Sequence, residues 1–187
     1  YSPFSTWTRG LAWILCGFAE QLEFLQSVPE AEFAEGGFTR EAVTAVYEKA
    51  AVSTAEWYLT HSFNDGMVYW DAGAPGIAGG VDYATTVDPY TVVEPIDSSA
   101  AAIAAQGFLR LGNYLRPVDE ARAQRYRRAA FLIARTLFAE PYLATDEKHQ
   151  GLILHSIYHR PNNWDYIPKG RKIPCGESSM WGDYHAA

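Results

Sequence analysis

Five stretches of the chain carry apolar residues at intervals of three and four positions, the spacing that places them on one face of an α-helix. They predict five helices, over residues 6–26, 39–62, 97–111, 118–138 and 177–187. Ser5 or Thr6 is expected to cap the first helix, and Pro29 to end it. A further apolar run, at residues 151–159, predicts a short strand.

Three more residues set the expected helix ends. A short connection follows the first helix, and Thr39 is the expected N-cap of the second. Asp97 is the expected cap of the third helix, which the pair Gly112-Asn113 should close. Glu177 opens the last helix, where an acidic side chain suits the positive end of the helix dipole.

The predicted helices differ in the side chains that they carry. The third has five alanines and one glycine within residues 100–107, and such small side chains let neighbouring backbones approach closely, so this helix should be internal. The fourth carries Arg122, Arg125, Arg127 and Arg128 on one side and apolar residues on the other, as an outer helix does. The predicted order is inner, outer, inner, outer, inner.

Long connections precede the third and fifth helices, at residues 63–96 and 139–176, whereas the inner-to-outer links are short. In a barrel of helical hairpins such long loops gather at one mouth. We therefore expect an all-α fold, with residues 1–187 forming a single domain that is part of an (α/α)-barrel. Six hairpins close such a ring and this chain supplies about two and a half, so a preceding segment or another subunit should cover its apolar flanks.

Composition and charge exclude two kinds of partner. The formal net charge of −7, without a basic face, argues against broad nucleic-acid binding. No apolar run approaches the roughly 20 residues that cross a bilayer, so no membrane partner is expected. The chain starts at Tyr1 without an initiator Met, and we interpret it as the continuation of a longer protein.

The two cysteines, Cys16 and Cys175, have no disulfide or metal-binding spacing. With both helix starts level, the thiols would lie about 15 Å apart at a rise of about 1.5 Å per residue. That separation excludes a disulfide, so reduced thiols are expected. For localisation, the cytoplasm is favoured over the periplasm.

Arg9 lies in the first turn of its predicted helix, where the helix dipole disfavours a cation. An anion beyond the helix start would explain it, and Trp13, one turn on, could stack on a sugar ring beside a bound carboxylate. The alternative is an internal ion pair from Arg9 to Asp97 or Asp183. The residues alone leave both open.

Other candidate groups point less clearly to chemistry. Asp97 and Glu177 fit as helix caps, whereas Asp183 lies too deep in its helix for a cap and suits a partner of Arg9 or a ligand of a sugar hydroxyl. His155 and His159 are four residues apart, but in an extended stretch and without a third ligand, so no zinc site is expected. No pair of carboxylates for hydrolysis is specified.

Several motifs together resemble the unsaturated glucuronyl hydrolases, glycoside hydrolase family 88. They are WTRGLAW at residues 7–13, DSSAAAIA at 97–104, GLILH at 151–155 and SSMWGDY at 178–184, with YWD at 69–71 similar to a loop before an inner helix. They are collinear over nearly the whole chain. The resemblance implies the second half of an (α/α)6 barrel.

The resemblance also implies an activity. It is the removal of a 4,5-unsaturated uronic acid from the non-reducing end of oligosaccharides left by polysaccharide lyases, by hydration of the vinyl ether with an aspartate as general acid/base. No metal or organic cofactor is implied. The implied partners are an acidic oligosaccharide and the preceding half of the barrel.

Site residues follow from the same resemblance. Arg9 and Trp13 match residues that contact substrate, and residues 178–183 lie at the mouth; the candidate substrate-binding residues are Arg9, Trp13, Trp70, Ser178, Ser179, Trp181 and Asp183. The family's catalytic aspartates belong to the preceding half, so no catalytic residue is assigned here and the chain alone is expected to be inactive. Leu11 stands where many members carry Gln, which affects substrate preference.

Two alternatives to this hydrolase remain. One is another (α/α)-barrel sugar enzyme, an epimerase or a polysaccharide lyase, for which histidine catalysis would be expected in the epimerase case. The other is a carbohydrate-binding helical domain without catalysis.

Overall fold

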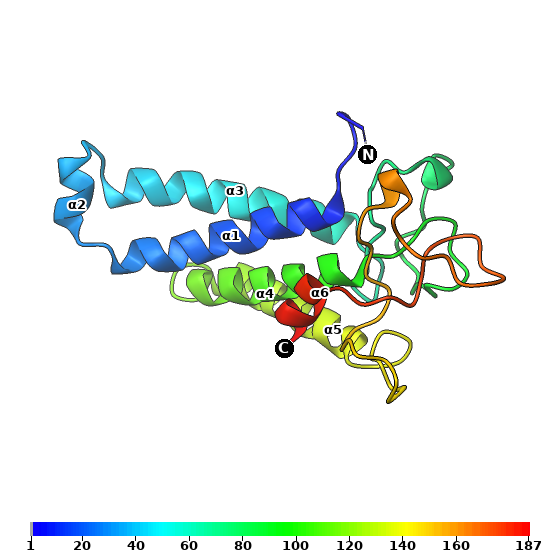
Figure 1. Cartoon of the computed structure of the whole chain (residues 1–187). Coiled ribbons are helices and arrows are strands. Elements are labelled where there is room, and N and C mark those ends of the chain that lie inside the picture. The colour runs from blue at the N-terminus through cyan, green and yellow to red at the C-terminus, as the bar shows by residue number, and fades with distance from the viewer. Residues whose placement is uncertain (1) are drawn as a thin grey trace.

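Residues 2–187 are described by a computed structural model, and they form helices and long loops (Figure 1). The elements are α1 (Thr8–Ser27), α2 (Glu30–Glu35), α3 (Arg40–Thr60), the 3₁₀ turn η1 (Pro75–Ile77), α4 (Ser98–Leu115), α5 (Glu120–Leu137), the 3₁₀ turn η2 (Arg160–Asn162) and α6 (Met180–Ala186). None of these described helices is both long and apolar enough to cross a membrane.

The helices alternate between inner and outer positions, as predicted. α4 packs against α1 and α6, while α3 and α5 pack behind α1 and α4 respectively. Twelve of the 18 residues of α4 are buried, whereas α5 buries a single stripe. The stripe consists of Ala123, Tyr126, Ala130, Ile133 and Leu137, at the spacings of three and four that one helix face requires.

Two glycines allow α4 to lie this close to its neighbours. A Cβ atom on Gly107 would lie 2.9 Å from the backbone nitrogen of Cys16 in α1. A Cβ on Gly112 would lie 2.7 Å from Cγ of Arg127 in α5. The prediction that Gly112 ends the helix was therefore wrong. α4 continues through this residue to Leu115, and the glycine serves close packing against α5 rather than helix termination.

The start of α1 also differs from the prediction. Neither Ser5 nor Thr6 caps the helix, which begins after Trp7 without a side-chain cap. Instead, the first free backbone amide, that of Thr8, donates to the carbonyl oxygen of Trp70 at 3.1 Å. The helix start is therefore held by the loop before α4, a contact between residues far apart in the sequence.

The connection after α1 contains a helix that the periodicity did not predict. α2 lies between α1 and α3, has only six residues and buries one of them, Phe33. The side chain of Arg40, at the start of α3, donates to the carbonyl oxygens of Leu25 and Val28 at the end of α1. This arginine satisfies carbonyl groups that the helix end leaves free.

The predicted strand at residues 151–159 is wrong. Among residues 2–187 only isolated β-bridges occur, and one of them joins Leu143 to Ile153. His155, two residues further on, has a positive φ of 68°, which turns the chain out of an extended path.

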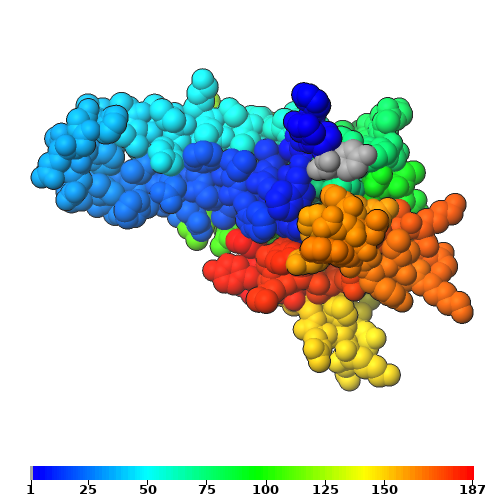
Figure 2. All heavy atoms as spheres, turned by 45° about the horizontal axis from the view of Figure 1, so that its top comes forward, coloured from blue at the N-terminus to red at the C-terminus, as the bar shows by residue number. Residues whose placement is uncertain are grey.

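The long loops and the first residues of α1 and α4 gather at one end of the helices, and α2 lies at the other (Figure 1). In the space-filling view, the segment around residues 155–175 lies against the start of α1 and against α6 (Figure 2). Cys16 and Cys175 are both buried and are not joined in a disulfide within residues 2–187.

Candidate functional site

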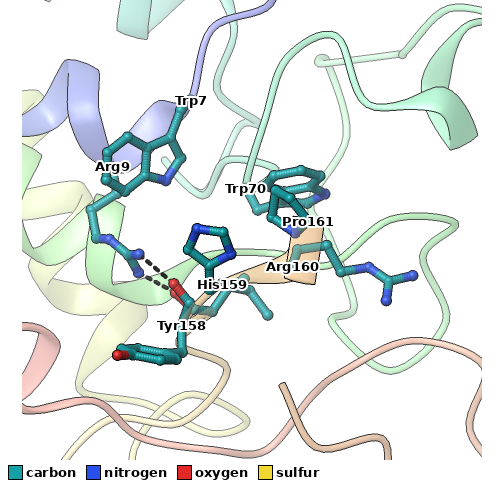
Figure 3. A pocket seen from close by; sticks show the side chains of 8 residues that line it. Trp7, Arg9, Trp70, Tyr158, His159, Arg160 and Pro161 are labelled. Carbon is teal, nitrogen blue, oxygen red and sulfur yellow. Dashed lines mark hydrogen bonds between the residues drawn. The ribbon is translucent and has the colours of Figure 1, made fainter. Parts of the chain in front are cut away.

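A cavity of about 170 Å³ opens where the start of α1 meets the two long loops. Figure 3 shows its walls, which are formed by Trp7, Arg9, Trp70, Ile157, Tyr158, His159, Arg160 and Pro161. No carboxylate is found among these lining residues. The cavity is therefore aromatic and basic.

Arg9 is the deepest charged group of the cavity wall, with only 4% of its surface exposed. Its Nη1 lies 3.3 Å from Oδ2 of Asp97 and also donates to the carbonyl oxygen of Ile157. Its Nη2 donates to the carbonyl oxygen of Tyr158 at 2.8 Å. Of the two ion pairs weighed from the sequence, the structure has the one with Asp97, since Asp183 accepts from the backbone of Ile153 instead.

Three tryptophan rings surround the guanidinium group of Arg9. Its Cζ lies 5.1 Å from the ring centroid of Trp7, 5.7 Å from that of Trp13 and 4.7 Å from that of Trp181. Such cation–π contacts and the Asp97 carboxylate offset the unfavourable helix dipole. The Nε atom of Arg9 is buried and has no hydrogen-bond partner among the described residues.

Trp13 and Trp7 pack edge to face with centroids 5.6 Å apart, and 40% and 42% of their respective surfaces are exposed. Both rings thus keep area for a ligand. Trp70 is different: it is 3% exposed and its Nε1 donates to Glu94 at 3.1 Å. The predicted substrate-binding residue Trp70 therefore forms a fixed wall of the cavity.

Asp97 lies at the N-terminus of α4 and is completely buried. It caps the helix, as predicted, by accepting from the backbone nitrogens of Ser99 and Ala100. Burial raises the pKa of its carboxyl group, although the nearby guanidinium of Arg9 acts in the opposite direction.

Three predicted substrate-binding residues lie beside α6 and are not among those that line the cavity. Ser178 donates to the carbonyl oxygen of Ile153 at 2.6 Å. Ser179 caps α6, so the prediction that Glu177 opens this helix was wrong; the carboxylate of Glu177 instead accepts from the backbone nitrogen of Tyr166. Asp183 accepts from the backbone nitrogen of Ile153 at 3.0 Å. Here they hold the loop to α6, and their binding role remains a prediction. Trp181 lies between the two regions, over Arg9 and stacked on Tyr158.

The cavity walls at residues 158–161 were missed from the sequence. Asp165 holds this turn, because its carboxylate accepts from the backbone nitrogens of Tyr158 and His159. An Asp a few residues after a polar turn is the only local signal for such a loop. That the loop reaches Arg9 depends on tertiary packing.

The two histidines of this region have different environments. His155 is buried, its Nδ1 accepts from the backbone nitrogen of Gly176 at 3.1 Å, and its Nε2 lies 3.2 Å from the carbonyl oxygen of Pro141. Burial lowers the pKa of His155 to about 4. His159 is exposed and lines the cavity. Within residues 2–187, no group of three His, Cys, Asp or Glu side chains could hold a metal ion.

Comparisons with known proteins show which proteins the chain is similar to. No protein-family profile matches the chain. The unsaturated glucuronyl hydrolase of Formosa agariphila is 27% identical over 183 residues, which are 97% of this chain and 34% of that protein. The unsaturated glucuronyl hydrolase of Bacillus sp. strain GL1 is 29% identical over 182 residues, which cover 97% of this chain and 37% of the relative. The chain thus spans about a third of the length of the curated relatives it matches.

Solved structures agree with the sequence matches. The crystal structure of the Bacillus sp. GL1 enzyme, described as responsible for the degradation of glycosaminoglycan, has a TM-score of 0.65 and covers 98% of this chain and 38% of its own. A mutant of the Streptococcus agalactiae enzyme in complex with dGlcA-GalNAc6S has a TM-score of 0.67 at 24% identity, covering 100% of this chain and 38% of its own.

The alternating helices and these neighbours define the chain as part of an (α/α)6 barrel, as predicted. The proteins that it resembles along nearly its whole length are the unsaturated glucuronyl hydrolases, which are glycoside hydrolases. The resemblance predicted from the sequence motifs is therefore confirmed.

Proposed function

We propose that this chain forms the substrate-binding part of a glycoside hydrolase that releases a 4,5-unsaturated uronic acid from the non-reducing end of lyase-generated oligosaccharides. The hairpins that close the ring come from a preceding segment or from another subunit. The reaction is the addition of water across the vinyl ether of the uronic acid, after which the bond to the remaining saccharide breaks.

The observation that carries this proposal is the buried Nε–H of Arg9, a residue of the cavity wall, which has no acceptor among residues 2–187. A buried donor without an acceptor costs about 1–3 kcal/mol, so a ligand that brings an acceptor gains this energy. A carboxylate beside a guanidinium forms a charge-assisted hydrogen bond. Among the possible acceptors, a carboxylate is therefore favoured over a neutral oxygen.

The size and lining of the cavity suit one ring of a saccharide. Its volume of about 170 Å³ lies below the roughly 300–1,000 Å³ of pockets for drug-sized ligands. The half-exposed indole of Trp7 in the cavity wall offers an apolar surface on which a sugar ring can stack, and the exposed ring of Trp13, outside the lining residues, packs against it. A uronate combines the ring and the carboxylate.

The proton donor and acceptor of the reaction belong to the hairpins outside this chain. General acid/base catalysis needs a group within hydrogen-bond distance of the reacting atoms. Because no carboxylate is found among the lining residues of the cavity, the role of residues 2–187 is to bind and orient the substrate. The chain alone is accordingly inactive.

The test follows the ultraviolet absorbance of the conjugated double bond, which hydration removes. The full-length protein is given unsaturated disaccharides derived from chondroitin, hyaluronan, heparin and gellan, with saturated disaccharides as controls. Loss of absorbance with at least one unsaturated substrate supports the proposal. Binding without turnover of any of them would instead identify a carbohydrate-binding domain.

A further inference from the structure

The segment at residues 155–158 is attached to the N-terminus of α4. The backbone nitrogen of Ser98 donates to the carbonyl oxygen of His155 at 3.0 Å. Two residues on, the backbone nitrogen of Ile157 donates to Oδ1 of Asp97 at 3.3 Å. The start of α4 thus fixes the backbone that continues into the cavity wall at Tyr158.

Arg9 attaches the same segment from the side of α1. Its guanidinium contacts Asp97 and donates to the carbonyl oxygens of Ile157 and Tyr158. Asp97, Arg9 and the backbone of Ile157 therefore form a closed ring of hydrogen bonds: the carboxylate accepts from the Ile157 nitrogen and from the guanidinium, and the guanidinium also donates to the Ile157 carbonyl oxygen. Moving one member displaces the other two.

A cap alone does not explain the charge of Asp97. A neutral Asn caps a helix about as well as Asp, and a buried carboxylate loses its hydration. Asp119 at the start of α5 is the exposed counterpart: it accepts from the backbone nitrogen of Arg122, its Oδ2 lies 3.3 Å from Nε of the same arginine, and its side chain is 35% exposed. Asp97 is fully buried and has three further partners, namely Arg9, the hydroxyl of Ser99 and the backbone of Ile157.

We propose that Asp97 is a positioning residue of the site: its carboxylate aligns Arg9 with residues 157–158, and so fixes both the anion-binding group and one wall of the cavity. The part of this inference that concerns substrate rests on the proposed function. The part that concerns the loop does not.

The experiment compares Asp97→Asn with the matched control Asp119→Asn in the full-length protein. Both variants keep a capping side chain and lose one charge. We measure backbone amide hydrogen exchange by mass spectrometry for peptides from residues 155–158, from the middle of α4 and from the start of α5. Exchange at residues 155–158 should rise about tenfold in Asp97→Asn, with little change in the middle of α4, because local attachment is lost. Asp119→Asn should leave residues 155–158 unchanged.

Two results would overturn the inference. One is unchanged exchange at residues 155–158 in Asp97→Asn, which would reduce Asp97 to a cap. The other is an equal rise across α4 and the loop, which would indicate general destabilisation. If Asp97→Asn does not fold, the double variant Arg9→Gln/Asp97→Asn replaces it, because it leaves no unpaired buried charge; the same rise is expected, and its absence would be equally decisive.

Kinetics separate this inference from the proposed function. Misaligned binding groups should raise KM about tenfold in Asp97→Asn while kcat changes much less, whereas a smaller folded fraction would lower kcat at constant KM. If the unchanged protein hydrolyses none of the disaccharides, the proposed function fails. The exchange experiment still decides whether Asp97 holds residues 155–158 in place.

Discussion

Arg9 and Asp97 form a buried ion pair, with Nη1 and Oδ2 3.3 Å apart and side chains that are 4% and 0% exposed. The two residues begin neighbouring inner helices, so the pair joins the starts of α1 and α4 below the cavity. Because both charges are out of water, each depends on the other. Removing one partner should therefore lower the free energy of unfolding far more than removing a charge at the surface.

Arg9→Ala should lower the free energy of unfolding by about 3–5 kcal/mol, because the Asp97 carboxylate remains buried without its counter-charge. Urea unfolding measures this loss. The matched control is Arg110→Ala, which breaks ion pairs with Glu20 and Glu23 on α1 between side chains that are 34–47% exposed. This change should lower the free energy of unfolding by about 1 kcal/mol or less. Equal effects of the two variants would contradict the special role of the buried pair.

The Arg9→Ala loss should also depend on pH. Without the guanidinium, the pKa of Asp97 rises further above its ordinary value in the folded state. A folded-state pKa above the unfolded one means that proton uptake favours folding as the pH falls. The deficit should therefore shrink in acid, and a deficit that grows in acid would contradict this explanation.

Arg9→Lys tests the part of Arg9 in substrate binding while it keeps a positive charge beside Asp97. Lysine keeps a cation near Asp97 but lacks the Nε–H and the planar fork of arginine. Affinity for an unsaturated uronyl disaccharide should fall by about 1.5–3 kcal/mol, the value of a hydrogen bond to a charged group. Isothermal titration calorimetry measures the change. Unaltered affinity would exclude Arg9 as the carboxylate ligand.

The contact between α1 and α4 gives a prediction for two glycines. In Gly107→Ala the new methyl group would lie 2.9 Å from the nitrogen and 3.0 Å from Cα of Cys16, and backbone atoms cannot move aside easily. Overpacking of this kind costs about 1–3 kcal/mol. Gly17→Ala, in α1 with nothing within 4 Å of the new Cβ, should instead stabilise the protein by about 0.5–1 kcal/mol. A lower urea midpoint in Gly107→Ala together with a higher one in Gly17→Ala would confirm the close contact.

The sequence predicted the helices better than it predicted the cavity. α3 and α4 follow from apolar spacing together with the caps Thr39 and Asp97, whose signals are local. α5 follows from apolar spacing alone, and its cap, Asp119, was not predicted. The start of α1 was misplaced because its first amide bonds to Trp70 rather than to a local side chain. A pattern within ten residues cannot report a contact across more than sixty.

The same difference between local signals and long-range contacts explains which residues of the site could be predicted. Arg9 was singled out by its conflict with the helix dipole, and Asp97 was one of two expected partners. The wall at residues 158–161 was missed because its position depends on Asp165 and on the attachment to α4. The predicted strand failed at His155, whose positive φ is supported by side-chain bonds that no periodicity describes.

His155 should make the protein less stable in acid. Its pKa is lowered from 6.5 to about 4 in the folded state by burial, so unfolded chains take up a proton first as the pH falls. Its contribution to stability is complete above pH 6.5 and is lost progressively toward pH 4, by roughly 3 kcal/mol in total. His185, whose pKa is also lowered by burial, acts in the same direction.

Urea unfolding between pH 4 and pH 8 measures the two contributions in His155→Gln and, as the matched comparison, in His185→Gln. The pH dependence should flatten more in His155→Gln, because His155 is fully buried whereas His185 is only partly buried. An equal or smaller flattening in His155→Gln than in His185→Gln would contradict the role given to His155.

His159 distinguishes hydrolysis from histidine catalysis at the same cavity. It is exposed and lines the cavity, so an epimerase-like reaction could use its imidazole as a base. In the proposed hydrolase the proton is moved by groups outside this chain, and His159→Asn should change kcat by less than about threefold, whereas loss of a general base costs about a hundredfold or more. Turnover of unsaturated disaccharides measures kcat, with Arg160→Gln as a control that removes a neighbouring lining charge instead. A hundredfold loss confined to His159→Asn would place the base within this chain and contradict the assignment of acid/base catalysis to the remaining hairpins.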